Sequence, residues 1–168
     1  MTADTQTPDI EALARQLGLE LLQRQWRVGT AESCTGGMVA AAITDIAGSS
    51  GWFDEGLVTY ANASKERLLQ VPASVLECHG AVSQPVVEAM VAGVLARGAD
   101  LALATSGIAG PDGGTADKPV GTVWFAWGSG EGTHSEVHCF SGDRQAVRRQ
   151  ATIHALQGAL QYLSKSTV

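Results

Sequence analysis

Charged side chains are scarce in this chain of 168 residues, making up 17% of it against 45% for hydrophobic residues. A disordered chain shows the opposite balance, so this composition predicts a folded protein. No apolar run approaches the roughly 18 residues that a membrane-spanning helix needs. The polar segment Met1–Pro8 contains neither Lys nor Arg and lacks the apolar core of a signal peptide. We therefore expect a cytoplasmic protein that has no membrane partner.

Basic residues are also few, with 11 Lys and Arg against 17 Asp and Glu and a net charge of −6. Nucleic-acid binding needs a clustered positive field, so we expect no nucleic-acid partner. The three cysteines, Cys34, Cys78 and Cys139, form no CxxC pair and support neither a zinc cage nor a disulfide framework. His134 and His138 would share a strand face, but no third ligand is evident, so the sequence predicts no metal site.

Two nucleotide-binding signatures are missing as well. No glycine-rich segment continues into the lysine and serine or threonine of a P-loop, and no GxGxxG run is present. A bound nucleotide cofactor of either usual type is therefore unsupported.

Helical and extended patterns alternate along the chain. Helices are predicted from Thr7-Pro8 to about Gln25, from Thr35-Gly36-Gly37 onward, from Asn62 to about Gln70, from Ser83 to Gly98, and from Ser141 to about Leu163. Thr7, Asn62, Ser83 and Ser141 are the predicted N-caps, and Val71-Pro72 would end the third of these helices. Strands are predicted over residues 28–31, 56–60, 101–105, 120–127 and 134–140. This order predicts an α/β fold, a single three-layer α/β/α sandwich with a mixed, mostly parallel sheet and one C-terminal antiparallel hairpin. Residues 9–168 would form one domain behind a flexible tail of residues 1–8.

Three small polar clusters follow predicted strands, over residues 30–37, 59–65 and 105–115. If the first three strands are parallel, all three clusters lie at one edge of the sheet. Ligands of open α/β sheets bind at the carboxyl ends of the strands, so this edge is the candidate site.

Ser33 stands in the first cluster, between a strand and the start of a helix. Such a turn exposes a hydroxyl and directs backbone N–H groups at it, as a serine nucleophile requires. Two alternatives stay open: Ser33 or Thr35 is simply a helix cap, or the neighbouring Cys34 is the nucleophile. None of the four histidines stands in the three clusters, which leaves lysine as the candidate base.

Lys65 is the lysine of the second cluster, near the start of a predicted helix. The positive helix end and burial would both lower its pKa, and a neutral amine can accept a serine proton. An ordinary surface lysine is the alternative. Arg144 and Arg148 are also unfavourably placed, because like charges four residues apart near the start of a helix repel each other. Either an anion lies between them or they form a solvated face.

These segments resemble the CinA C-terminal domain family. The resemblance rests on Ala31–Gly37, on Gly56–Tyr60 with Asn62 and Lys65, on Thr105–Pro111 with Gly121–Val123, and on Phe140–Arg144. It covers about residues 9–163 and has the form of a stand-alone domain.

The resemblance implies a nicotinamide-nucleotide amidase that uses no metal and no cofactor. Its substrate would be nicotinamide mononucleotide, and its products nicotinate mononucleotide and ammonia. The family's serine, tyrosine and lysine fall on Ser33, Tyr60 and Lys65. We expect substrate contacts from the turn after the first strand, from the loop after the third, and from the two arginines: Cys34, Thr35, Gly36, Gly37, Thr105, Ser106, Gly107, Gly110, Arg144 and Arg148.

Two other functions stay open on the sequence. One is a serine amidase for a different small amide, and the other is a catalytically silent nucleotide-binding or regulatory domain. The sequence also leaves homo-oligomerisation open.

Overall fold

A computed structural model describes residues 8–166 of the chain. The elements follow in chain order: α1 (Ile10–Arg24), β1 (Val28–Glu32), α2 (Met38–Thr44), the 3-10 helix η1 (Ser49–Gly51), β2 (Phe53–Val58), α3 (Asn62–Leu69), α4 (Ala73–His79), α5 (Gln84–Leu95), β3 (Leu101–Gly107), β4 (Thr122–Ser129), β5 (Gly132–Cys139) and α6 (Arg144–Lys165). Apart from Pro8, the tail predicted over residues 1–8 lies outside the described residues. Within residues 8–166, no helix has the length and apolar character needed to span a membrane.

The five strands form one sheet in the order β2-β1-β3-β4-β5. Strand β1 pairs in parallel with β2 and β3, whereas β4 is antiparallel to both β3 and β5. The sheet is therefore mixed, and β4 alone runs against the other strands. This confirms the predicted fold class and the C-terminal hairpin.

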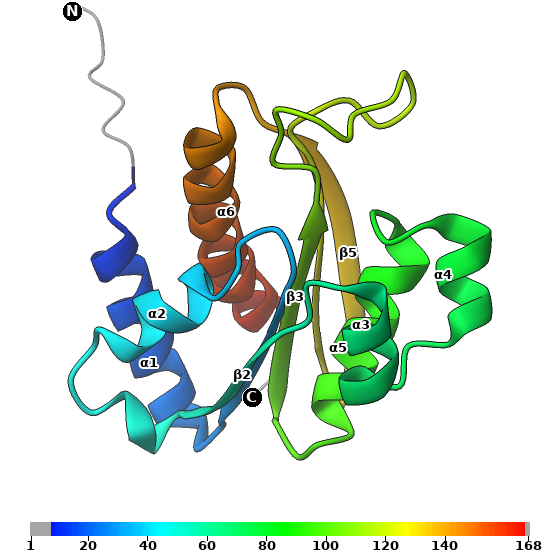
Figure 1. The fold of residues 1–168 in the computed structure, drawn as a ribbon. Helices are drawn as coiled ribbons and strands as arrows, with labels where there is room; N and C mark the ends of the chain where they lie inside the picture. The colour runs from blue at the N-terminus through cyan, green and yellow to red at the C-terminus, as the bar shows by residue number, and fades with distance from the viewer. Residues whose placement is uncertain (1–7, 167–168) are drawn as a thin grey trace, which may run out of the picture.

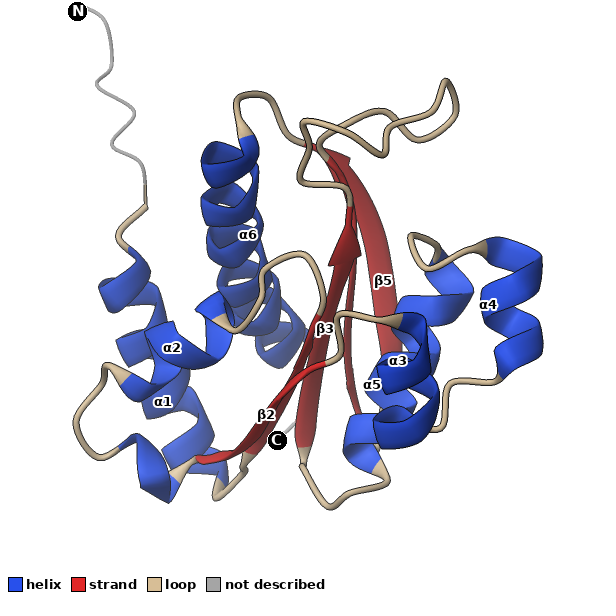
Figure 2. Cartoon of the chain, in the orientation of Figure 1, coloured by secondary structure: helices blue, strands red, loops and turns tan. Residues whose placement is uncertain are grey.

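Helices cover both faces of the sheet, as Figures 1 and 2 show. On one face α1, α2 and α6 enclose a core that includes Leu17, Ile43 and Phe125. On the other face α3, α4 and α5 enclose a second core that includes Leu69 and Met90. The three-layer prediction is confirmed, and burial of these two apolar faces is what fixes the sheet between its helices.

The structure corrects several predicted element ends. Helix α1 is capped by Asp9, whose side chain accepts from the Glu11 N–H, while the predicted cap Thr7 lies outside the described residues. Helix α6 is capped by Asp143 rather than Ser141. A carboxylate at the cap is also attracted to the positive end of the helix dipole, whereas a hydroxyl carries no charge.

Two further differences lie between β1 and α5. Strand β2 covers residues 53–58, earlier than the predicted 56–60. Helix α4 was not predicted, because Pro72 was taken only as the end of the preceding helix. The same proline is the N-cap of α4, and proline is compatible with a helix start because its missing N–H would be unpaired there anyway.

Candidate active site

The parallel strands β1, β2 and β3 bring the three polar clusters to one edge of the sheet. A cavity of about 290 Å³ opens there. It is lined by Ser33, Cys34, Tyr60, Lys65, Ala81, Val82, Ser106, Gly107, Ile108, Ala109, Gly110, Asp112, Gly113 and Arg144. The three clusters therefore converge as predicted, and the candidate catalytic residues Ser33, Tyr60 and Lys65 all line this one cavity.

Lys65 is the buried cation of this cavity, with 0% of its surface exposed. Its amine donates to the Ser33 Oγ at 3.2 Å, to the Thr59 carbonyl at 2.7 Å and to the Tyr60 carbonyl at 3.3 Å. All three acceptors are uncharged, so no carboxylate holds the proton on the amine. Burial lowers the pKa of Lys65 to about 8, which makes a neutral amine accessible near physiological pH.

The helix-end part of the Lys65 argument needs a correction. Helix α3 is capped by Ala61, without a side-chain hydrogen bond, and Asn62 is its first residue rather than its cap. Lys65 therefore stands one position deeper in the helix than predicted, and burial is the cause of its lowered pKa.

A tight turn between β1 and α2 holds Ser33. The Ser33 N–H donates to the Thr105 carbonyl on β3, and the Gly36 N–H returns to the Ser33 carbonyl. Gly36 and Gly37 both have positive φ, a conformation that glycine adopts without strain. Within residues 8–166, neither the Cys34 N–H nor the Thr35 N–H donates to another residue. The turn thus leaves two backbone donors beside the Ser33 hydroxyl.

Glu32 supports the same turn and was not singled out by the sequence. Its side chain is fully buried, and its carboxylate accepts from the Val39 N–H at 2.8 Å and the Ala40 N–H at 3.2 Å. It therefore accepts hydrogen bonds from N–H groups in the first turn of α2, which the cap residue Gly37 cannot do because it has no side chain. Burial raises the pKa of Glu32 despite these bonds. A carboxylate three residues before the predicted helix start at Thr35 was the only available signal.

The two arginines of α6 contact different parts of the site. The Arg148 guanidinium donates to the Cys34 carbonyl at 3.0 Å and to the Thr35 carbonyl at 3.2 Å. The Arg144 guanidinium donates to the Gly110 carbonyl at 2.8 Å and to the Tyr60 hydroxyl at 3.0 Å. Only Arg144 lines the cavity, so the expectation of one anion held between both arginines does not match their separate contacts.

Tyr60 contributes two different groups. Its carbonyl accepts from Lys65, whereas its side chain is 58% exposed and its hydroxyl accepts from Arg144. In the described part of the chain, this hydroxyl bonds to neither Ser33 nor Lys65. The Tyr60 phenol therefore lies beside the Arg144 guanidinium, whereas the Lys65 amine contacts the Ser33 hydroxyl.

The remaining predicted residues divide into two groups. Cys34, Ser106, Gly107 and Gly110 line the cavity, whereas Thr35, Gly36, Gly37 and Thr105 do not. The Thr35 and Thr105 hydroxyls pair with each other at 2.8 Å. Burial raises the pKa of the Cys34 thiol to about 12, so this rival nucleophile stays protonated at neutral pH.

Several lining residues were not predicted as contacts. Ala81, Val82, Ile108 and Ala109 add apolar surface, and Asp112 adds a carboxylate. Asp112 stands inside the third polar cluster, but nothing in its spacing marks it. Ala81 and Val82 come from the connection between α4 and α5, and only tertiary structure brings that connection to the cavity.

The sequence showed no third ligand for His134 and His138, but the structure brings two further ligand types beside His138. Strand β5 also carries Glu136, and α6 brings His154 beside it. Ligand atoms of Glu136, His138 and His154 lie within 4.8 Å of one another. None of these side chains lines the cavity that contains Ser33.

The chain is similar to known proteins in both sequence and fold. The model of the CinA C-terminal domain family matches residues 10–163. The chain is 55% identical over 159 residues to a nicotinamide-nucleotide amidohydrolase PncC of Enterobacter agglomerans, covering 94% of this chain and 97% of that protein. It is 58% identical to the protein of the same name from Pseudomonas putida, with 90% and 96% covered. A competence damage-inducible protein A from Klebsiella pneumoniae superposes with a TM-score of 0.92 at 41% identity, covering 95% of this chain and 100% of that one.

Proposed function

Because the chain belongs to the CinA C-terminal domain family, we propose that it hydrolyses the carboxamide of nicotinamide mononucleotide with Ser33 as nucleophile and Lys65 as base. The relatives named nicotinamide-nucleotide amidohydrolase match nearly the whole chain, which supports the substrate class. The observation that carries the catalytic assignment is the buried contact of 3.2 Å between the Lys65 amine and the Ser33 hydroxyl.

The first step is attack on the amide. Neutral Lys65 accepts the Ser33 proton while the Ser33 oxygen bonds to the carboxamide carbon, and the carbonyl oxygen gains negative charge. The N–H groups of Cys34 and Thr35 donate to no other described residue, and we assign them as the donors to this oxygen. Loss of one such donor in serine enzymes costs roughly 10²–10³ in rate.

The second half of the reaction reverses the proton path. The protonated Lys65 amine gives its proton to the leaving nitrogen, and ammonia departs from the acyl-enzyme. Water then attacks the ester carbon, Lys65 takes up a water proton, and the Ser33 hydroxyl is restored as nicotinate mononucleotide leaves. The direct contact between the two side chains means that this route needs no relay through Tyr60.

The nucleotide part of the substrate would lie along the loop after β3. Arg144 lines the cavity and has a planar guanidinium suited to phosphate. It also holds the Tyr60 hydroxyl and the Gly110 carbonyl. We assign Arg144, with Tyr60 beside it, to the phosphate, and Asp112 to a ribose hydroxyl. Arg148 instead holds the turn that carries Ser33.

The test is the release of ammonia and nicotinate mononucleotide from nicotinamide mononucleotide by the purified chain. Nicotinamide riboside, which lacks the phosphate, serves as the matched substrate and should react with a much higher KM. Strong chelation should leave the rate intact, because serine-lysine chemistry needs no metal. Faster release from an unrelated amide, or no release from any amide, would contradict the proposal and favour another amidase or a silent binding domain.

A further inference from the structure

Four polar side chains form a compact cluster between the edge strand β5 and helix α6, away from the cavity that contains Ser33. Glu136 lies between His134 and His138 on the edge strand β5, and His154 of α6 faces it. Residues 134, 136 and 138 alternate along the strand, so all three side chains point to the α6 face of the sheet. Neither the reaction proposed above nor the packing of the core requires three imidazoles around one carboxylate.

We propose that Glu136, His138 and His154 form a binding site for one divalent transition-metal ion, with Zn²⁺ as its probe. Imidazole nitrogen and carboxylate oxygen are established ligands of this metal class, and three protein ligands with an open fourth position are a common zinc arrangement. The site would join β5 to α6.

Two of the three distances between ligand atoms fit such a site with small movements, and the third pair lies within 4.8 Å. Zinc bonds of 2.0–2.1 Å in a tetrahedron place neighbouring ligand atoms about 3.3 Å apart. Glu136 Oε1 lies 3.5 Å from His138 Nε2 and 2.5 Å from His154 Nε2. The first distance already matches, and the second must widen by under about 1 Å as the metal replaces the hydrogen bond. His154 would then coordinate through Nε2 and carry its remaining proton on Nδ1.

His134 has a different place in this arrangement. Its Nε2 lies 3.5 Å from Glu136 Oε2, the oxygen that does not face the other two imidazoles. It is therefore suited to hold the carboxylate in orientation, as residues behind metal ligands do. We assign it a positioning role.

Aromatic rings fix the two histidine ligands. His154 lies 4.6 Å from Phe125 between ring centroids, and His138 stacks on Phe140 with an interplanar angle of 16°. These contacts restrict the rotamers before any ion binds, which reduces the entropy lost on binding.

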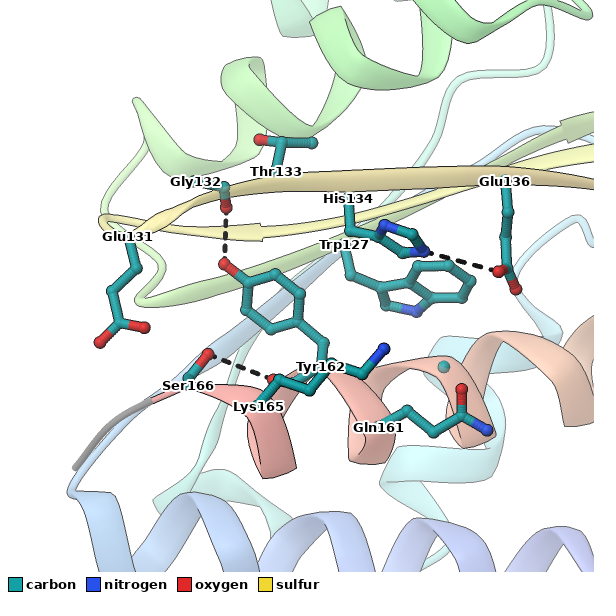
Figure 3. A pocket seen from close by; sticks show the side chains of 11 residues that line it. Trp127, Glu131, Gly132, Thr133, His134, Glu136, Gln161, Tyr162, Lys165 and Ser166 are labelled. Carbon is teal, nitrogen blue, oxygen red and sulfur yellow. Dashed lines mark hydrogen bonds and ion pairs between the residues drawn. The ribbon is translucent and has the colours of Figure 1, made fainter.

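The cluster is also reachable from solvent. A cavity of about 310 Å³ lies between the β4–β5 hairpin and the C-terminal half of α6, and His134 and Glu136 line it. Figure 3 shows these two side chains pointing into the cavity beside Trp127, with Tyr162 and Lys165 of α6 opposite them. An ion can reach Glu136 from this cavity, and the His138 side chain is itself 44% exposed to solvent.

The experiment is titration of the full chain with Zn²⁺ by calorimetry, in a Cys78→Ser/Cys139→Ser background that removes the two exposed thiols. We expect one ion per chain, with affinity at least about tenfold weaker in Glu136→Gln and in His138→Ala. His134→Ala should weaken binding less than His138→Ala. His79→Ala, which alters the histidine outside the cluster, should bind as the parent does.

A second readout follows stability. Zn²⁺ at about a hundredfold excess over its dissociation constant should raise Tm by roughly 5 °C or more, and a chelator should reverse the shift. The His138→Ala variant changes a side chain that is 44% exposed, so it should remain folded and show no shift. Absence of Zn²⁺ binding, or equal binding by Glu136→Gln, His138→Ala and His79→Ala, would overturn the proposal. Ammonia release reports separately on Ser33 and Lys65, so failure of this site leaves the proposed activity untouched.

Discussion

Lys65 and Glu136 are both ionisable groups between the sheet and its helices, but their surroundings are opposite. Lys65 is fully buried, and its amine meets three uncharged oxygens. The Glu136 side chain is 34% exposed and lies among three imidazoles. Burial lowers the pKa of Lys65 toward neutral pH. Burial acts to raise the pKa of Glu136, but the His154 hydrogen bond and the other histidines outweigh it and lower that pKa.

This difference separates a reactive group from a structural one. A lysine that is buried without a charged partner has a pKa close enough to neutral to exchange its proton there, as a base must. A carboxylate held among histidines stays ionised and keeps its neighbours in place, as a metal ligand must. The predictions below test whether the two regions differ in this way.

The largest effect is expected at the nucleophile. Ser33→Ala removes the atom that forms the acyl bond, and we expect a loss of about 10⁴-fold or more in the rate of ammonia release. The matched control is Cys34→Ala, which should retain most of the rate because burial keeps that thiol protonated. The reverse pattern would identify Cys34 as the nucleophile, and thiol reagents should then inactivate the parent protein.

Substitution of the base comes next. Lys65→Met keeps the length of the side chain without its amine, and Lys65→Arg keeps a cation that cannot be deprotonated. We expect both to lose roughly 10²–10⁴-fold in kcat/KM. The parent should show a rate that rises with pH up to about 8, the pKa of Lys65, and levels off above it. Circular dichroism checks folding, and substantial activity in the arginine variant would exclude the base role.

The same lysine should leave a signature in stability. Its pKa falls on folding from 10.5 to about 8, so between these values the unfolded chain binds the proton and the folded chain does not. Stability therefore rises with pH across this window. At about 1.4 kcal/mol per pKa unit, the gain is about 3 kcal/mol. Denaturant unfolding of the parent and of Lys65→Met at pH 7 and pH 10.5 measures it, and an unchanged difference between the two proteins would contradict the buried neutral amine.

Sequence reasoning brought the contacting side chains Ser33 and Lys65 together because their signals are local. Ser33 and Lys65 each follow a strand, and the parallel order of β1 and β2 brings strand ends together. The layers of the fold could be predicted from the sequence for the same reason, since the apolar stripe of α5 and the hairpin of β4 and β5 are short-range patterns.

The rest depends on contacts between distant segments. Arg148 lies more than a hundred residues from the carbonyls of Cys34 and Thr35 that it holds, and its spacing from Arg144 suggested a shared anion instead. His154 likewise joins Glu136 only when α6 packs on β5. The presence and order of strands can be predicted from periodicity, whereas the rotation of a helix about its axis is decided by packing.

The two arginines should separate in kinetics. Arg148→Ala releases the turn that positions Ser33, so we expect kcat to fall by roughly tenfold to 10²-fold with little change in KM. Arg144→Ala removes the cavity's guanidinium, so KM for nicotinamide mononucleotide should rise while KM for nicotinamide riboside changes little. Arg149→Ala alters an exposed neighbour and serves as the control. Identical kinetic changes in Arg144→Ala and Arg148→Ala would show that both arginines act on one anion.

The smallest effect is expected where the charge is compensated. Glu136→Gln preserves size and removes the charge, and partly exposed ion pairs contribute about 1 kcal/mol or less to stability. Because folding lowers the pKa of Glu136, its stabilisation is present above the ordinary carboxyl pKa and is lost as pH falls through the folded value. The stability difference from the parent should therefore be visible at pH 7 and vanish in acid, measured against Glu77→Gln, an exposed matched control.

Ammonia release by Glu136→Gln should stay within about twofold of the parent, because the Glu136 carboxylate is not part of the Ser33 cavity. A tenfold loss would mean instead that α6 transmits the state of the histidine cluster to Arg144 and Arg148, and the two regions would then be one functional unit.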